Sequence, residues 1–183
     1  MSSDASRQVR SQLTGSWELI EYSLQLATDP SNKLYPMTAH VKGIILYTED
    51  GYMSAQLHIP GQKPFEGEQP FERSVSAEEA AAAEAEWAKV GRNYVAYTGE
   101  FYIDVDNQQP VIKHHMRCAS LPYMVTDVQE RTFQFEDRSD GNRYLVLGLP
   151  QPIKVRGETR NVFVLWKRLP FNERAEPDLA RKW

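Results

Sequence analysis

Short segments rich in β-branched and aromatic residues follow one another along most of this chain of 183 residues. Turn-forming clusters such as "DNQQP", "RSDGN" and "GLPQP" separate them, and no repeat of fixed period interrupts the series. Because consecutive short strands usually pair with their neighbours, this succession predicts an antiparallel meander. We count eight such segments: residues 15–26, 43–47, 52–59, 94–105, 111–118, 131–137, 143–149 and 161–169.

Eight antiparallel strands can close on themselves, which removes the exposed edges of an open sheet. A barrel of this size has an interior wide enough for side chains or for one small ligand. The sequence therefore predicts an all-β, eight-stranded antiparallel barrel, and a flattened two-sheet sandwich is the alternative. One helix is expected between the third and fourth strands, in "SAEEAAAAEAEWAKVG", where Ser76 and Glu79 match a capping box and Gly91 can end the helix.

Charge and composition limit the classes of partner. The formal net charge is −4 with interspersed acidic and basic residues, so we expect no nucleic acid partner. No stretch is apolar enough for a membrane span or a signal peptide, which predicts a cytoplasmic protein without a membrane partner. We expect a single domain over residues 1–183, with flexible or loosely docked ends at 1–12 and 171–183. Cys118 is the only cysteine and is expected to be a small buried residue.

The segment "VIKHHMRC" places two adjacent histidines in a predicted strand. Successive side chains on a strand point to opposite faces, so His114 and His115 cannot both face the interior. The face of Ile112, His114 and Met116 is the more apolar and is expected to line the cavity. An imidazole there suits proton transfer near neutral pH, and the alternative is a buried structural histidine. His115 and Arg117 lie on the other face and are weaker candidates.

Two neighbouring strands supply further candidates. In "YTGEFYID", Tyr97 and Phe101 share an apolar face that should point inward, and Gly99 between them indicates a bulge or room for a ligand. In "GYMSAQLHIP", we favour Tyr52 and Gln56 as the residues that face an oxygenated ligand, although simple amphipathicity would turn the opposite face inward. The expected catalytic residues are thus His114, Tyr52 and Tyr97, and the expected substrate-binding residues are Tyr47, Gln56, Trp87, Phe101, His115, Met116 and Arg117.

The sequence lacks the motifs of several classes of enzymes and binding sites. The chain has no Gly-rich phosphate loop and no serine in a nucleophile elbow. It has no dense cluster of His, Asp and Glu residues at metal-ligand spacing. We therefore expect neither a metal nor a cofactor.

Parts of the sequence resemble a known superfamily. "GSWEL" resembles the Gly-X-Trp signature of the lipocalin/calycin barrels, and "VLWKRL" resembles their last strand. The resemblance implies that Arg168 packs across Trp17 at one end of the barrel. The segments "GIILYTEDGYMSAQLHIPGQKPF", "YVAYTGEFYID" and "VIKHHMRCASLP" are similar to the lipocalin-like domain family of small intracellular microbial proteins. Departures from that pattern are Tyr123, where members often carry Asn, and a long loop at 61–73.

The resemblance implies a lipocalin-like (calycin) barrel around a small-molecule cavity. It also implies a cofactor-free isomerase or cyclase that acts on a small hydrophobic, oxygenated metabolite, polyketide-like or terpenoid-like, in secondary-metabolite biosynthesis. A fold alone does not transfer a function, so two alternatives stay open. One is a non-catalytic small-molecule binding or carrier protein, and the other is a hydrolase or hydratase acting on the same substrate class. A homodimer is possible.

Overall fold

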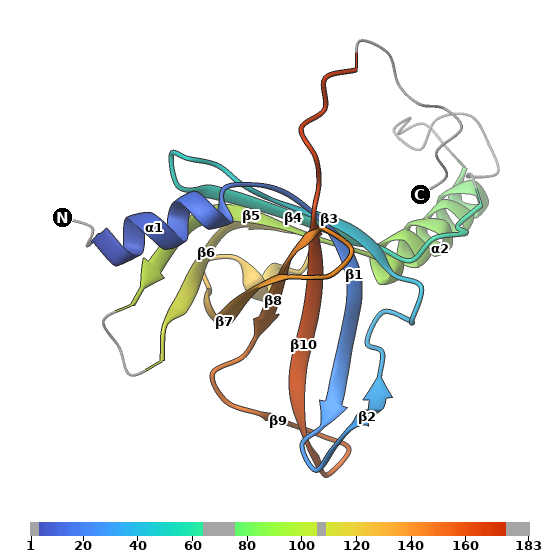
Figure 1. Cartoon of the computed structure of the whole chain (residues 1–183). Helices are drawn as coiled ribbons and strands as arrows, with labels where there is room; N and C mark the ends of the chain where they lie inside the picture. Colours follow the sequence, from blue (N-terminus) through green and yellow to red (C-terminus); the bar gives the residue numbers. More distant parts are fainter. Residues whose placement is uncertain (1–3, 64–75, 106–108, 175–183) are drawn as a thin grey trace.

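The computed structural model describes residues 4–63, 76–105 and 109–174. Its strands form one antiparallel sheet that closes because β1 (Gly15–Leu26) pairs with both β3 (Lys42–Tyr47) and β10 (Glu158–Arg168). The predicted eight-stranded antiparallel barrel is confirmed, and the sandwich is excluded (Figure 1). Between β3 and β10 the strands follow in chain order: β4 (Tyr52–His58), β5 (Tyr94–Asp104), β6 (Val111–Ala119), β7 (Val128–Asp137) and β8 (Arg143–Gly148).

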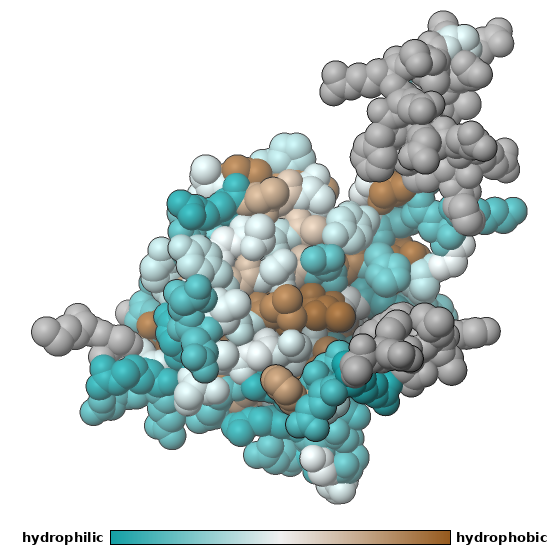
Figure 2. All heavy atoms as spheres, turned by 90° about the horizontal axis from the view of Figure 1, so that it is seen from above, coloured by the Kyte–Doolittle hydropathy of each residue, from teal (hydrophilic) through white to brown (hydrophobic). Residues whose placement is uncertain are grey.

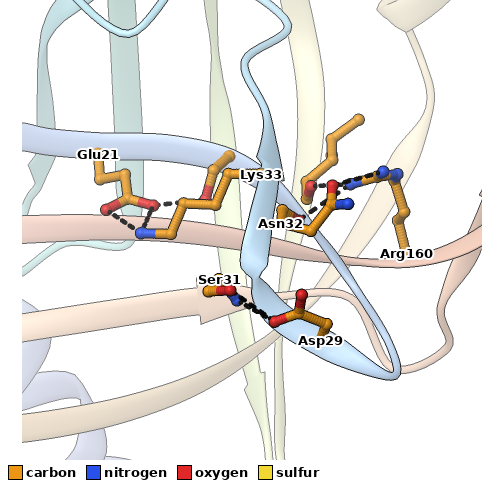
Figure 3. A network of polar contacts seen from close by, with 8 residues as sticks. Glu21, Asp29, Ser31, Asn32, Lys33 and Arg160 are labelled. Atoms are coloured by element: carbon orange, nitrogen blue, oxygen red, sulfur yellow. Dashed lines mark hydrogen bonds and ion pairs between the residues drawn. The ribbon is translucent and has the colours of Figure 1, made fainter.

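Two short strands, β2 (Asp29–Leu34) and β9 (Ile153–Val155), extend the sheet beyond the barrel and were not expected. Arg160 on β10 attaches β2 to the barrel, and its side chain is only 2% exposed. Its guanidinium donates to the Leu24 carbonyl oxygen at 2.9 Å and to the Asn32 carbonyl oxygen at 3.1 Å (Figure 3). Beside it, Lys33 and Glu21 form an ion pair at 2.8 Å. The segment that reads as a loop in sequence is therefore held in place by polar contacts.

The N-terminal segment differs from the expectation of a loosely docked end. Residues 4–13 form α1 (Asp4–Leu13), and Leu13 is fully buried in the core. The Arg10 guanidinium carbon lies 4.4 Å from the centroid of the Phe101 ring, and Trp17 Nε1 donates to the Leu13 carbonyl oxygen at 2.8 Å. These contacts dock α1 on the barrel.

The second helix, α2 (Ala77–Asn93), lies between β4 and β5 in the chain, that is, between the third and fourth strands of the barrel. It continues past Gly91, which was expected to end it. Figure 1 shows α1 and α2 on opposite sides of the barrel. Of the C-terminal segment, residues 175–183 lie outside the described part of the chain.

Trp17 and Arg168 pack together at the α1 end of the barrel, as the family resemblance implies. The Arg168 guanidinium carbon lies 4.8 Å from the Trp17 ring centroid, and the guanidinium donates to the carbonyl oxygens of Gln12, at 3.1 Å, and Thr14. Gly15 has a φ of +126°, and a Cβ at that position would lie 2.5 Å from Arg168 Nη2. The Gly-X-Trp motif therefore requires glycine both for its backbone conformation and for the approach of the arginine.

Two strands contain one extra residue that reverses the alternation of their side chains. On β1 the register shifts at Ile20, so that Tyr22 faces the interior and Glu21 faces outward. On β6 it shifts at Arg117, opposite Gly99 on β5. A Cβ at Gly99 would overlap the carbonyl oxygen of His115, so this glycine marks a bulge rather than room for a ligand.

The outer surface is mainly hydrophilic on the face shown in Figure 2, with apolar residues gathered in a small central area. Other large apolar side chains fill the interior, where Trp17, Ile45, Met53 and Leu145 are at most 2% exposed. The alternation of the barrel strands thus produces one core within the closed sheet.

Candidate functional site

A cavity of about 220 Å³ enters the barrel from the end opposite α1. It opens to solvent beside Pro36 and Tyr123, and Tyr123 is 75% exposed. An apolar cavity of roughly 150 Å³ is large enough to bind benzene, so this one has room for a somewhat larger molecule. The remaining lining residues are Tyr22, Met37, Leu57, Val95, Tyr97, Leu121, Met124, Gln129, Arg131, Leu147, Val162, Val164 and Trp166.

Arg131 is the one charged side chain among these described lining residues. It is half-buried on β7, where it pairs with the fully buried Ile112 of β6 and so faces the interior. Its guanidinium donates to the Glu130 carbonyl oxygen at 3.0 Å and to the side-chain oxygen of Gln129. Within the described residues no carboxylate forms an ion pair with it.

Two tyrosines, Tyr22 and Tyr97, line the same cavity. Burial raises the pKa of both Tyr22 and Tyr97, and the charge of Arg131 opposes that rise in each case. Both hydroxyls are therefore protonated at neutral pH and can donate hydrogen bonds. Neither hydroxyl has a hydrogen-bond partner in the part of the chain that the structure describes.

His114 faces the interior, as the strand pattern predicts, but it lies behind the cavity wall. It is 1% exposed, and its Nε2 lies 3.0 Å from the Tyr47 hydroxyl oxygen. Burial, with a smaller effect of Arg131, lowers the His114 pKa to about 3, so the imidazole is neutral at pH 7. Neither His114 nor Tyr47 is among the residues that line the cavity. The catalytic role of His114 stays a prediction.

The structure places the other candidates on different surfaces. Phe101 and Met116 point inward but pack in the core, away from the cavity. Tyr97 lines the cavity. Tyr52 and Gln56 were expected to face a ligand, and that orientation is wrong. Tyr52 is 44% exposed, and Gln56 accepts a hydrogen bond from the Tyr94 hydroxyl on the outer face. The amphipathic pattern of the strand decides its orientation, because the apolar residues Met53, Ala55 and Leu57 face inward.

The outward face of β6 forms a surface ion-pair cluster rather than a binding wall. His115 and Arg117 both contact Glu100 on β5, at 3.5 Å and 3.2 Å. Cys118, expected to be buried, is exposed, because the extra residue at Arg117 pairs it with the outward Thr98. Trp87 on α2 is 40% exposed and does not line the cavity.

Sequence reasoning missed Arg131, Tyr22 and Gln129. A signal for Arg131 and Gln129 was present, because both alternate with Phe133 and Phe135 on one face of "QERTFQF". A charged residue that continues an apolar strand face is a candidate for a ligand contact. Tyr22 had no such signal, because a bulge at Ile20 sets its orientation.

The structure defines the class of protein: a closed antiparallel barrel with an apolar cavity that carries a few polar groups, which is the architecture of small-molecule-binding barrels. The family model of the lipocalin-like domain matches residues 14–169, and the chain belongs to that family. A search of curated proteins finds no match.

Two further observations concern the described residues. They contain no group of three or more His, Cys, Asp or Glu side chains arranged to hold a metal ion. None of their helices combines the length and the apolar character needed to cross a membrane.

Proposed function

We propose that this protein binds a small hydrophobic, oxygenated metabolite in the cavity next to Tyr97 and Arg131. The observation that carries the proposal is the composition of the cavity wall, in which a few polar side chains stand among mostly apolar ones. Apolar walls supply most of the affinity for such a ligand, and a few fixed polar groups orient it. The size of the cavity favours a molecule of one or two rings, or a folded chain of similar volume.

Uptake of 1-naphthylamine, a neutral fluorescent probe, tests this proposal. The wild-type protein should show saturable fluorescence enhancement with one site per chain. Val162→Trp should abolish it, because Val162 lines the cavity and the indole would fill the space. Asn161→Trp is the matched control, since it adds the same side chain on the exposed face of the same strand. Uptake that is absent in wild type, or equal in the two variants, would refute binding inside the barrel.

A second candidate function is a cofactor-free isomerase or cyclase for a polyketide-like or terpenoid-like substrate. Arg131 and the protonated hydroxyl of Tyr97 favour it, because donors inside a cavity can stabilise an enolate oxygen as it forms. Enclosure of a flexible substrate in one reactive conformer would add to the rate. A base must accept the proton that leaves the substrate carbon, either a water molecule in the cavity or His114 acting through the Tyr47 hydroxyl, to which it is hydrogen-bonded.

Hydrogen–deuterium exchange of a bound 1,3-diketone separates the two candidates. An enzyme of this kind should accelerate exchange at the carbon between the carbonyl groups, with slower exchange in Tyr97→Phe. His114→Gln then reports whether the buried histidine takes part. If the bound diketone exchanges no faster than in buffer, the isomerase or cyclase is refuted and ligand binding remains.

A further inference from the structure

Arg131 differs in its environment from the other arginines that enter the barrel or its sheet. Arg168 donates to two carbonyl oxygens and lies over an indole ring. Arg160 reaches two carbonyl oxygens, an amide oxygen and the Glu158 carboxylate. Within the described part of the chain, Arg131 donates only to an amide oxygen and to the carbonyl oxygen of its own neighbour. A guanidinium carries five N–H donors, so several remain for another partner.

Among the residues that the structure describes, no negative charge inside the barrel balances that guanidinium. Asp127 is connected to it only through Gln129, whose amide nitrogen lies 3.3 Å from Asp127 Oδ2, and Asp127 is itself exposed. The titratable groups whose pKa responds to the charge of Arg131 are neutral at pH 7: the hydroxyls of Tyr22, Tyr47 and Tyr97 and the imidazole of His114. Taking a cation out of water is unfavourable unless a counter-charge or hydrogen bonds compensate for the lost hydration.

We infer that the ligand of this cavity carries one oxyanion, such as a carboxylate, which binds Arg131 while its apolar body contacts the surrounding side chains. The inference rests on the function proposed above and adds the chemical class of the ligand. Arginine suits a planar oxyanion because its N–H groups form a fixed fork that matches two oxygens. The Tyr22 and Tyr97 hydroxyls line the same cavity and have no partner among the described residues, so they can donate to the same oxyanion.

Matched acid and amide pairs test the inference by isothermal titration calorimetry. The probes are cinnamate with cinnamamide and octanoate with octanamide, each pair equal in size and different in charge. Wild-type protein should bind each acid about 10-fold to 100-fold more tightly than its amide, the range for a hydrogen bond to a charged group. Arg131→Met should remove that preference, and Arg131→Lys should keep part of it, because an ammonium preserves the charge without the fork.

Arg138→Met is the control variant, because it removes one positive charge from an exposed residue directly after the end of the same strand. It should leave the preference for acids unchanged. The inference fails if wild type binds the amides as tightly as the acids, if it binds neither, or if Arg131→Met retains the preference.

The neutral probe 1-naphthylamine distinguishes failure of this inference from failure of the proposed function. Uptake of that probe without a preference for acids would overturn the anionic ligand and leave a binding barrel. If neither the neutral probe nor the acids bind, both proposals are wrong. Retained uptake of the neutral probe by Arg131→Met shows in addition that the variant is folded.

Discussion

The two ends of the barrel interior are built from the same strands but are filled differently. At the α1 end, Trp17, Phe101 and His114 are at most 1% exposed, and none of them lines the cavity described above. At the opposite end, Tyr22, Val95 and Tyr97 are half-buried around an open space. A closed barrel can be a packed core or a container, and here the lengths and shapes of side chains make it both.

The extra residues on β1 and β6 lie at the boundary between the packed end of the barrel and the end that holds the cavity. Before them come Leu19 and Met116, which are buried in the packed region. After them come Tyr22, which lines the cavity, and Ala119, which pairs with the lining residue Tyr97. Bulges of this kind redirect side chains and are frequent next to functional sites. The comparison teaches that a change of register can separate a structural half of a strand from a ligand-binding half.

The largest effect should come from breaking the packed end. Trp17→Ala should lower the free energy of unfolding by about 3–5 kcal/mol, because it leaves a large cavity and removes the platform of Arg168. Chemical denaturation monitored by circular dichroism measures the change. Trp87→Ala, at an exposed indole, is the control and should cost far less. Equal losses in the two variants would contradict the described packing.

The boundary between the ends can be broken at Gly99. Gly99→Ala should destabilise the protein by about 1–3 kcal/mol, because the new Cβ would displace the backbone of β6. The effect is measured by thermal or denaturant unfolding. Gly91→Ala is the opposite case, because a Cβ at this position of α2 would lie in open space. The substitution should stabilise the protein by about 0.5–1 kcal/mol. A neutral effect of Gly99→Ala would mean that the bulge is not needed.

The packed end should also respond to pH through His114. The pKa of His114 is about 3 in the folded protein, compared with 6.5 for an imidazole in water. The unfolded chain therefore binds a proton at this residue more readily than the folded protein does. The stability due to neutral His114 is therefore complete above about pH 6.5 and is lost as the pH falls toward 3. His114→Gln should reduce the slope of stability against pH by up to about 1.4 kcal/mol per pH unit between pH 6 and 4.

Denaturant unfolding at a series of pH values measures that slope. His58→Gln, which removes an exposed imidazole, is the control substitution. If wild type and His114→Gln have parallel pH profiles, then His114 is not a buried neutral group in the folded protein.

The smallest expected effect on stability concerns Arg131 at the cavity end of the barrel. In the absence of ligand, Arg131→Met should raise the free energy of unfolding slightly, by up to about 1 kcal/mol, because it replaces an unbalanced charge with an apolar side chain of similar length. Differential scanning calorimetry of ligand-free protein measures the change. Arg168→Met provides the contrast and should destabilise, since it leaves the carbonyl oxygens of Gln12 and Thr14 unpaired. A clear loss of stability in Arg131→Met would indicate that Arg131 is a structural residue.

Much of the barrel and of its packed end could be predicted from the chain. The turn clusters and short β-rich segments predicted eight antiparallel strands. The alternation of side chains along a strand correctly predicted that His114, Phe101 and Tyr97 face inward. The helix α1 was missed because its apolar signal is weak, although Val9 and Leu13 have the four-residue spacing of one helix face. The orientation of Tyr52 was wrong because a preference for polar ligand contacts overrode plain amphipathicity.

The sequence by itself determined the elements of this protein and which residues are apolar enough to fill its interior, because strand alternation and turn chemistry are local properties. Only the tertiary structure decided where the packed side chains of the barrel interior end and the cavity begins. That boundary depends on the register shifts at Ile20 and Arg117 and on the approach of α1, which brings Leu13 and Arg10 against one end alone. These are contacts between segments far apart in the chain, and they leave Arg131 inside the barrel without a balancing charge among the described residues.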